Sequence, residues 1–168
     1  EELIYFDSVL DSIARSKTAG DIAEIREELA IAGYVKKQVK GKKKTQPPKF
    51  QEYVSAEGYK ILVGKNNSQN DYLTTSLAAK NDLWFHVKNI PGSHVIVFSH
   101  GNEVSDRTVL QAARLAAQNS KAADSSNTAV DYTPVKYVKK PNGAKPGMVI
   151  YTTNKTVYVT PDTRGEIK

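Results

Sequence analysis

The sequence predicts an α+β fold: a mainly antiparallel sheet with two helices, preceded by a helical hairpin or a coiled-coil remnant. Its 168 residues fit one domain of the usual size plus an appendage. The first 35 residues have the apolar spacing of helices, whereas short strand-like runs dominate from Phe50 onward. Single helical stretches separate groups of neighbouring strands, which favours antiparallel pairing.

Charge divides the chain into segments. Residues 1–35 carry three basic and eight acidic side chains, and residues 36–49 carry seven lysines and no acid. The remaining residues, 50–168, carry fourteen basic and ten acidic side chains. A block of one sign is solvated rather than packed, so we expect a basic, extended and mobile linker over 36–49. A folded domain is then expected over 50–162 and a short tail over 163–168.

The composition excludes several classes of protein. With no cysteine, the chain has no disulfide scaffold, thiolate zinc site, iron–sulfur cluster or cysteine nucleophile. No apolar run approaches the roughly 18 residues of a membrane-spanning helix, and no signal-like segment follows the first residues. Because the chain begins without Met, we expect it to be a fragment of a larger protein.

Two amphipathic helices are predicted within residues 1–35, because apolar residues recur at intervals of three and four. They are Leu3, Phe6, Leu10 and Ile13 in the first helix and Ile22, Ile25, Leu29 and Ala32 in the second. Asp21 is the expected N-cap of the second helix, with Glu24 completing a capping box. Such a narrow stripe needs a partner. We therefore expect either a helical hairpin packed on the domain or the end of a longer antiparallel coiled coil.

The domain itself is expected to alternate between short strands and two helices. The expected strands are 50–54, 59–63, 83–87, 94–98, 130–139, 148–152 and 156–159, with a hairpin at Glu57-Gly58 and the last two joined at Asn154-Lys155. The expected helices are 68–79 and 108–119, the second capped by Ser105 or Asp106. Lys140–Gly147 is expected to be a rigid basic loop.

The segment from Asp82 to Val95 has the greatest density of side chains able to carry chemistry. Trp84 and His86 are two apart, so on a strand they share one face, and His94 returns close to them after a Pro-Gly turn. The two histidines are candidates for a metal site, and Ser93 with His94 for a nucleophile and its base, although neither has a convincing acidic partner. The same residues also fit a buried structural cluster or a polar, aromatic ligand surface. We expect Trp84, His86, Pro91, Gly92 and His94 to cluster in space without binding a metal.

A second group of side chains combines positive charge with aromatic rings. Its members are Tyr132, Lys136, Tyr137, Lys139, Lys140, Lys145 and Lys155. Lysines suit phosphates and rings stack on unpaired bases, so this composition favours nucleic acid. Lysines that protect an edge strand from aggregation explain the same residues. Glycine spacing excludes both the P-loop and the dinucleotide fingerprint.

Several of these motifs, taken in order, resemble one known family. They are Val63-Gly64-Lys65-Asn66-Asn67, Asp82-Leu83-Trp84-Phe85-His86-Val87-Lys88, Ile90-Pro91-Gly92-Ser93-His94-Val95, Ala112-Ala113-Arg114-Leu115, Val130-Asp131-Tyr132-Thr133, Val138-Lys139-Lys140-Pro141 and Lys145-Pro146-Gly147. Together they resemble the NFACT-R domain of the RqcH/NEMF-type ribosome quality-control family, over about Phe50 to Asp162. Residues 1–35 resemble the end of the coiled coil that precedes that domain.

The resemblance implies a cytoplasmic RNA-binding module without catalytic activity, metal or cofactor. Its implied partners are stalled large ribosomal subunits and tRNA, in a process that adds alanine tails to nascent chains. The residues that we expect to bind RNA are Lys65, Trp84, His86, Lys88, His94, Arg114, Tyr132, Lys136, Lys139, Lys140 and Lys145. Streptococcal members are also named fibronectin/fibrinogen-binding proteins. A second expectation is therefore a surface adhesin module for host fibronectin or fibrinogen, displayed without a signal peptide.

Overall fold

An antiparallel sheet of six strands forms the centre of this computed structural model, which describes residues 2–37 and 48–161. The strand order is β1-β2-β4-β3-β5-β8, and a separate pair joins β6 to β7. The strands are β1 (Gln51–Val54), β2 (Lys60–Val63), β3 (Leu83–Val87), β4 (Val95–Val97), β5 (Thr128–Pro134), β6 (Val138–Lys139), β7 (Ile150–Tyr151) and β8 (Lys155–Val159). The predicted α+β fold with an antiparallel sheet is confirmed.

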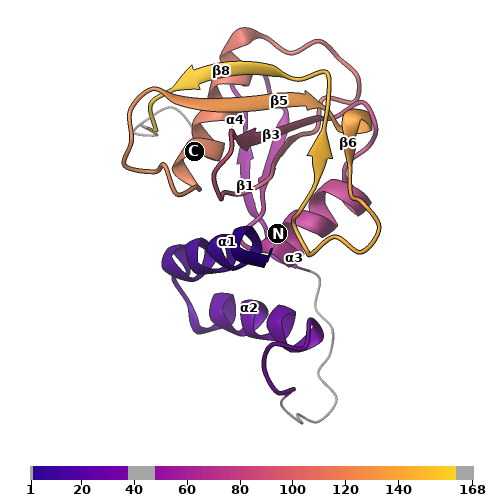
Figure 1. Cartoon of the computed structure of the whole chain (residues 1–168). Coiled ribbons are helices and arrows are strands. Elements are labelled where there is room, and N and C mark those ends of the chain that lie inside the picture. Colours follow the sequence, from indigo (N-terminus) through magenta and orange to yellow (C-terminus); the bar gives the residue numbers. More distant parts are fainter. Residues whose placement is uncertain (1, 38–47, 162–168) are drawn as a thin grey trace.

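Four α-helices and two short turns complete the described structure (Figure 1). They are α1 (Glu2–Arg15), α2 (Ala19–Ile31), α3 (Asn67–Tyr72), the π-helical turn η1 (Leu73–Leu77), α4 (Asp106–Gln118) and the 3-10 turn η2 (Val135–Tyr137). Ser105, one of the two residues predicted for this position, caps α4. No helix in the described ranges is long and apolar enough to cross a membrane. Most of the expected basic linker and all of the expected tail lie outside the described residues.

The two faces of the sheet bury separate apolar clusters, because successive side chains of a strand point in opposite directions. One face packs under α4, and its buried residues include Ile61, Val63, Phe85, Val87, Val95, Val97, Val130, Ala112, Ala113, Leu115 and Ala116. The other face packs under η1 and η2, with Leu62, Leu73, Trp84, Ile96 and Val135 as its buried residues. The candidate functional residues are divided between these two faces.

The hairpin of α1 and α2 packs on the sheet domain beside α3 (Figure 1). Its buried apolar residues are Tyr5, Val9 and Ile25. The predicted stripe is thus only partly buried: Ile25 is 3% exposed, but Leu3 is 83% exposed and Leu10 is 64% exposed. The polar side chains of Ser8 and Glu28 are instead buried, because they hydrogen-bond to Asn67 and Ser68 at the polar start of α3.

Thr18, rather than Asp21, is the N-cap of α2. The Thr18 hydroxyl accepts a hydrogen bond from the backbone N–H of Asp21 at 3.0 Å. The Asp21 carboxylate in turn accepts from the backbone N–H of Thr18, which completes a capping box. The helix begins three residues earlier than predicted because Asp21 occupies its third helical position.

The predicted strand over 130–139 is interrupted. β5 ends at Pro134, after which the backbone N–H of Val135 donates to the Asp82 carbonyl at 2.9 Å. The Lys136 N–H donates to the Lys80 carbonyl at 3.0 Å, so the chain leaves the sheet and follows the loop before β3. β7 then pairs with β6, and β8 pairs with β5, so the last two strands are not partners in a hairpin.

Candidate nucleic-acid interface

A groove of about 480 Å³ lies between η1 and the chain that follows β5. The residues that line it are Thr74, Thr75, Ala78, Ala79, Lys80, Val135, Lys136, Val138, Lys140 and Val149. All the charged side chains in this lining are lysines. A concave surface with charge of one sign focuses its electrostatic field, so this groove attracts anions.

Backbone hydrogen bonds fix both walls of the groove. At the end of η1 the Ala78 N–H donates to the Leu73 carbonyl at 2.9 Å. The Asp82 carboxylate then holds the following loop, because it accepts from the backbone N–H of Ala79 at 2.8 Å and of His100 at 3.0 Å. With the bond from Lys136 to the Lys80 carbonyl, these contacts place two exposed lysines side by side.

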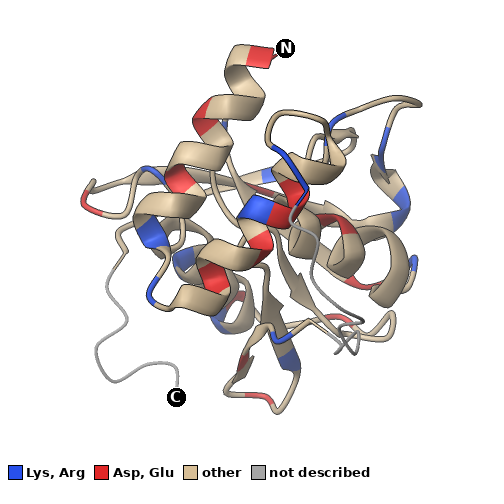
Figure 2. Cartoon of the chain, turned by 90° about the horizontal axis from the view of Figure 1, so that it is seen from below, with Lys and Arg blue, Asp and Glu red and all other residues tan. Residues whose placement is uncertain are grey.

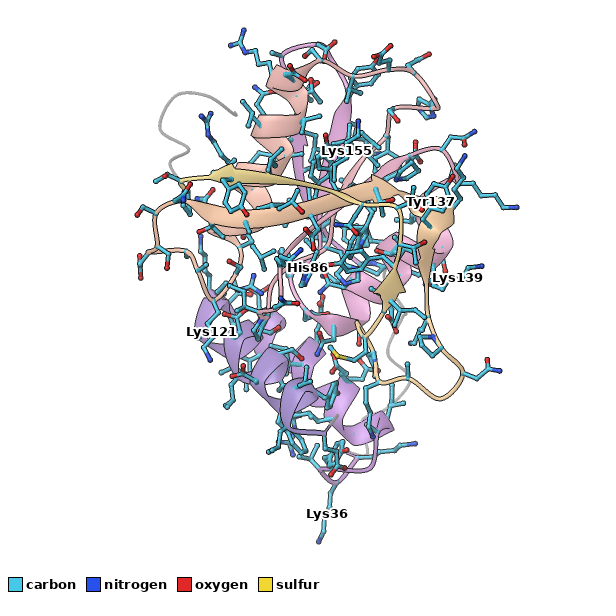
Figure 3. All side chains as sticks on the ribbon, turned by 45° about the horizontal axis from the view of Figure 1, so that its top comes forward. Lys36, His86, Lys121, Tyr137, Lys139 and Lys155 are labelled. Atoms are coloured by element: carbon cyan, nitrogen blue, oxygen red, sulfur yellow. The ribbon has the colours of Figure 1, made fainter. Side chains whose placement is uncertain are left out.

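The lysines around the groove have different partners. The Lys136 ammonium lies 5.2 Å from the centre of the Tyr137 ring, and Lys139 is exposed on β6. Tyr137 and Lys139 project from the same side of the molecule, away from Lys36 on the hairpin (Figure 3). Lys140 forms an ion pair with Asp71. The positive charge at the groove is thus partly compensated at Lys140.

An aromatic cluster lies beneath the groove, on the same face of the sheet. The Trp84 ring stacks on His86 with centroids 5.7 Å apart and planes 4° apart. His94 meets both rings edge-on, at 5.4 Å from Trp84 and 5.5 Å from His86, and Tyr151 lies 4.7 Å from Trp84. The prediction that Trp84, His86 and His94 cluster is confirmed. The Nδ1 of His86 lies 2.5 Å from the Val87 carbonyl oxygen, and Gly92 forms a β-bridge with Ser120.

Burial prevents two of these residues from touching a ligand directly. Trp84 is 0% exposed and His94 is 1% exposed. His94 is also held on two sides: its Nδ1 lies 2.8 Å from the Thr74 hydroxyl, and its backbone N–H donates to the Asn70 amide oxygen at 3.0 Å. His94 therefore connects α3 and η1 to the start of β4.

The sequence of the domain matches a known family. Residues 49–153 match the family described as NFACT protein RNA binding domain. The chain belongs to this NFACT family. The protein "Rqc2 homolog RqcH" of Bacillus subtilis is 52% identical over 171 residues, which cover all of this chain and 30% of that protein. The chain thus spans less than a third of this relative.

Two further proteins extend the comparison. "Ribosome quality control complex subunit 2" of Schizosaccharomyces pombe is 34% identical over 80 residues, which cover 46% of this chain and 8% of that protein. The solved structure of the C-terminal part of the fibronectin/fibrinogen-binding protein from Streptococcus suis aligns with a TM-score of 0.89 at 42% identity. That alignment covers 98% of this chain and 66% of the other. The predicted family resemblance is confirmed.

Only some residues of the predicted cationic and aromatic group lie close together in the NFACT domain. Lys136 and Lys140 line the groove and Lys139 follows the lining residue Val138 on β6, but Tyr132 stacks on Phe85 at 5.2 Å and packs against the α4-side cluster. Lys155 lies on β8, apart from β6 (Figure 3). The interruption after Pro134 explains this division, because it turns the later residues away from the sheet.

Other predicted residues lie on different parts of the NFACT domain. The Lys65 ammonium lies 3.7 Å from the Asp21 carboxylate, and the Lys88 ammonium lies 3.5 Å from that of Asp131. Arg114 lies on α4, across the sheet from the groove. The half-buried Lys145 lies over the rings of two hairpin tyrosines, at 4.9 Å from Tyr34 and 5.9 Å from Tyr5. Sequence reasoning missed Lys80, which no motif distinguishes from an ordinary loop lysine.

The structure also bears on the chemical roles considered for Ser93 and His94. The Ser93 hydroxyl accepts a hydrogen bond from the Arg15 guanidinium at 3.1 Å, while His94 is engaged by Thr74. The structure thus shows Ser93 paired with the hairpin rather than with a base. Within residues 2–37 and 48–161, no three histidine or acidic side chains gather as metal ligands would.

We expect the stability of the NFACT domain to fall when the pH drops below about 6.5. Burial, and then the nearby His86, holds the pKa of His94 well below its ordinary value of 6.5, and burial also lowers the pKa of His86. In the unfolded chain both imidazoles take up protons near pH 6.5, before the folded chain does. Below pH 6.5 the unfolded state thus binds more protons than the folded state. The stability that is present above pH 6.5 is therefore lost as the pH falls toward the lower pKa values of the folded chain.

Urea denaturation of the wild type and of His94→Gln, measured between pH 4 and 7, checks this expectation. The variant should be less stable at pH 7 but should lose less stability on acidification. His100→Asn is the matched control, because His100 is exposed and has a positive φ of 53°, which asparagine tolerates. Equal pH slopes for the wild type and His94→Gln would contradict the expectation.

Proposed function

We propose that this chain is the RNA-binding C-terminal module of a ribosome-associated quality-control factor. The match of residues 49–153 to an RNA-binding domain family is the observation that carries the proposal. The lysine-lined groove supports it, since phosphates dominate the affinity of proteins for RNA. The names of the Bacillus and Schizosaccharomyces relatives supply the link to ribosome quality control.

A wider role is proposed for the whole protein. We propose that it acts in the cytoplasm on stalled large ribosomal subunits and tRNA, promoting alanine tailing of nascent chains. This chain covers 30% of its Bacillus relative, and we propose that its own share of the role is to hold RNA rather than to catalyse a reaction. Within that share, the buried Trp84 and His94 position the groove wall, and exposed lysines contact the phosphates.

A second candidate function comes from the Streptococcus suis relative, whose name states binding to fibronectin and fibrinogen. A basic surface attracts acidic proteins as well as nucleic acids, so charge alone does not separate the two functions. Immobilised fibronectin and fibrinogen therefore belong beside RNA in any binding test of this chain. Binding to either protein without any affinity for RNA would favour the adhesin function.

Replacing Lys136, Lys139 and Lys140 together by alanine is expected to weaken RNA binding and its salt dependence. Each phosphate contact contributes about −0.7 to −0.9 to the slope of log affinity against log salt concentration, so three lost contacts flatten it by about 2–3. Fluorescence anisotropy with a labelled RNA, at several salt concentrations, measures the slope. Substitutions at exposed positions usually cost within about 0.5 kcal/mol each, so the fold should survive.

The matched control removes the same charge from the N-terminal region, by replacing the exposed Lys17, Lys36 and Lys37 with alanine. Its salt slope should stay close to that of the wild type. Lys36 lies far from Tyr137 and Lys139 (Figure 3), so a local effect and a net-charge effect are distinguishable. An equal loss of slope in both variants would show that RNA responds to net charge and would contradict a specific interface.

A further inference from the structure

The groove has two chemically different parts. Its cationic part contains Lys80 and Lys136, which are both exposed. Its apolar part contains Ala78, Val138 and Val149, which belong to the margin of the Trp84 cluster. A volume of about 480 Å³ lies in the range of about 300–1,000 Å³ that is typical of small-ligand sites. The groove therefore suits a ligand that carries negative charge next to a flat apolar group.

The cationic part is preorganised by the backbone. Because the Lys136 N–H donates to the Lys80 carbonyl, the two residues stay adjacent without a bound ligand. Lys140 lies in the same lining, but its ion pair with Asp71 already compensates its charge. Lys80 and Lys136 are thus the cations best placed for one phosphate group, for which a lysine ammonium is an ordinary partner.

The apolar part is rigid because it rests on the core. Val135 is 8% exposed, and Leu73 and Trp84 are fully buried behind it. The neighbouring turn η1 is a π-helical turn, a rare geometry that is frequent at functional sites. On its side of the groove, Thr75 and Ala79 are exposed. A planar base laid against this wall removes apolar area from water without rearranging the domain.

We propose that this groove holds a single unpaired nucleotide, with its base against Val135, Val138 and Val149 and its phosphate at Lys80 and Lys136. The proposal rests on the proposed RNA-binding function and names the ligand class of that same site. Bases within a duplex are stacked on both faces and paired at their edges, so they cannot enter a groove of this size. The domain should therefore prefer single-stranded or looped RNA to a perfect duplex.

Two variants test the two parts of the groove separately. Ala79→Trp fills the groove without changing charge, at an exposed position whose backbone bond to Asp82 is retained. Lys80→Ala with Lys136→Ala removes the cationic part, and Lys17→Ala with Lys36→Ala is its control of equal charge. The probes are a labelled single-stranded octamer, a hairpin duplex of the same length, adenosine monophosphate and poly-glutamate.

We expect Ala79→Trp to weaken octamer binding by about 10-fold, the scale of one lost base contact, without changing the salt slope. The double-lysine variant should flatten that slope by about 1.4, and its control should not. Adenosine monophosphate should shift the backbone amide resonances of Thr75, Ala79 and Lys136 in the wild type. Duplex binding should be weaker than octamer binding and insensitive to Ala79→Trp.

Each contrary result has a distinct meaning. If the wild type binds RNA and neither variant weakens that binding, the groove is not the nucleotide site. The proposed RNA-binding function then stands. Absence of RNA binding, with adenosine monophosphate still shifting the groove resonances, supports the groove and contradicts the broader function. Poly-glutamate is expected to bind more weakly than the octamer. If it binds as tightly, and the double-lysine variant loses as much affinity for it as for the octamer, the groove recognises charge alone and the nucleotide assignment is overturned.

Discussion

Replacing Glu28 by alanine is expected to release the N-terminal hairpin from the sheet domain. The Glu28 side chain is 4% exposed, and its carboxylate accepts hydrogen bonds from the Tyr5 hydroxyl and the Asn67 amide. It also accepts from the backbone N–H of Ser68 at 3.2 Å and from the Ser68 hydroxyl at 3.3 Å. Each buried donor left unsatisfied costs about 1–3 kcal/mol. Detachment of the hairpin becomes favourable because water then satisfies these donors.

Hydrogen exchange is the direct measurement, because it reports α1 and α2 separately from the sheet. Faster exchange in both helices, with unchanged protection in β3 and β5, is the expected result. Glu27→Ala is the matched control, since Glu27 is exposed on the same helix and its replacement removes an equal charge. Glu28→Gln keeps the shape and one acceptor oxygen, so it should be intermediate. Equal protection in Glu28→Ala and the wild type would exclude the carboxylate as the docking contact.

The docking face of the hairpin was not predictable from apolar spacing. The spacing correctly selected Ile25 but also selected the exposed Leu3 and Leu10, because the domain presents the polar start of α3 to the hairpin and polar side chains therefore face inward. Figure 2 shows acidic residues along both hairpin helices, and sequence alone does not tell which of them is buried. Glu24 behaves like Glu28: its carboxylate accepts from Asn66 at 2.7 Å and from Gln69 at 2.9 Å.

The interior of the sheet was more predictable than the groove. Two-residue alternation correctly placed Trp84 and His86 on one face, because that spacing is a local property of any strand. The groove instead depends on the departure of the chain at Pro134 and on the contact of Lys136 with Lys80. Those residues are 56 positions apart, and only the three-dimensional structure brings them together. Lys80 was therefore missed, and Tyr132 was grouped with lysines from which it is separated by the sheet.

Contacts of the basic loop join the hairpin and the groove into one unit. Asp71 pairs with Lys140 and also accepts from the Gly147 N–H at 2.7 Å. Gly147 has a positive φ of 77°, and a Cβ there would lie 2.6 Å from the Asn67 amide oxygen. Lys145 meanwhile covers Tyr34 of the hairpin. The loop is thus fixed between α3 and the hairpin, so its position depends on hairpin docking.

Replacing Trp84 by alanine is expected to cost about 3–5 kcal/mol of unfolding free energy, the usual range for a fully buried tryptophan. Its ring contacts His86, His94 and Tyr151, and all these contacts are lost. Trp84→Phe should cost much less, because a ring remains and one unfavourable feature disappears. Among the described residues, the Trp84 Nε1–H is buried without a hydrogen-bond partner, and such a donor costs about 1–3 kcal/mol.

The same pair of variants separates a positioning role of Trp84 from direct contact with RNA. Because Trp84 is buried behind Val135, its loss should deform the apolar wall and lower affinity for the single-stranded octamer. No charge is removed, so the slope of log affinity against log salt should stay unchanged, unlike that of the lysine variants. Denaturation and anisotropy, measured at a temperature where both variants remain folded, check this. Trp84→Phe should retain nearly wild-type affinity if the ring acts by supporting the wall. If Trp84→Phe lost RNA binding while its stability stayed intact, the indole would instead contact RNA directly.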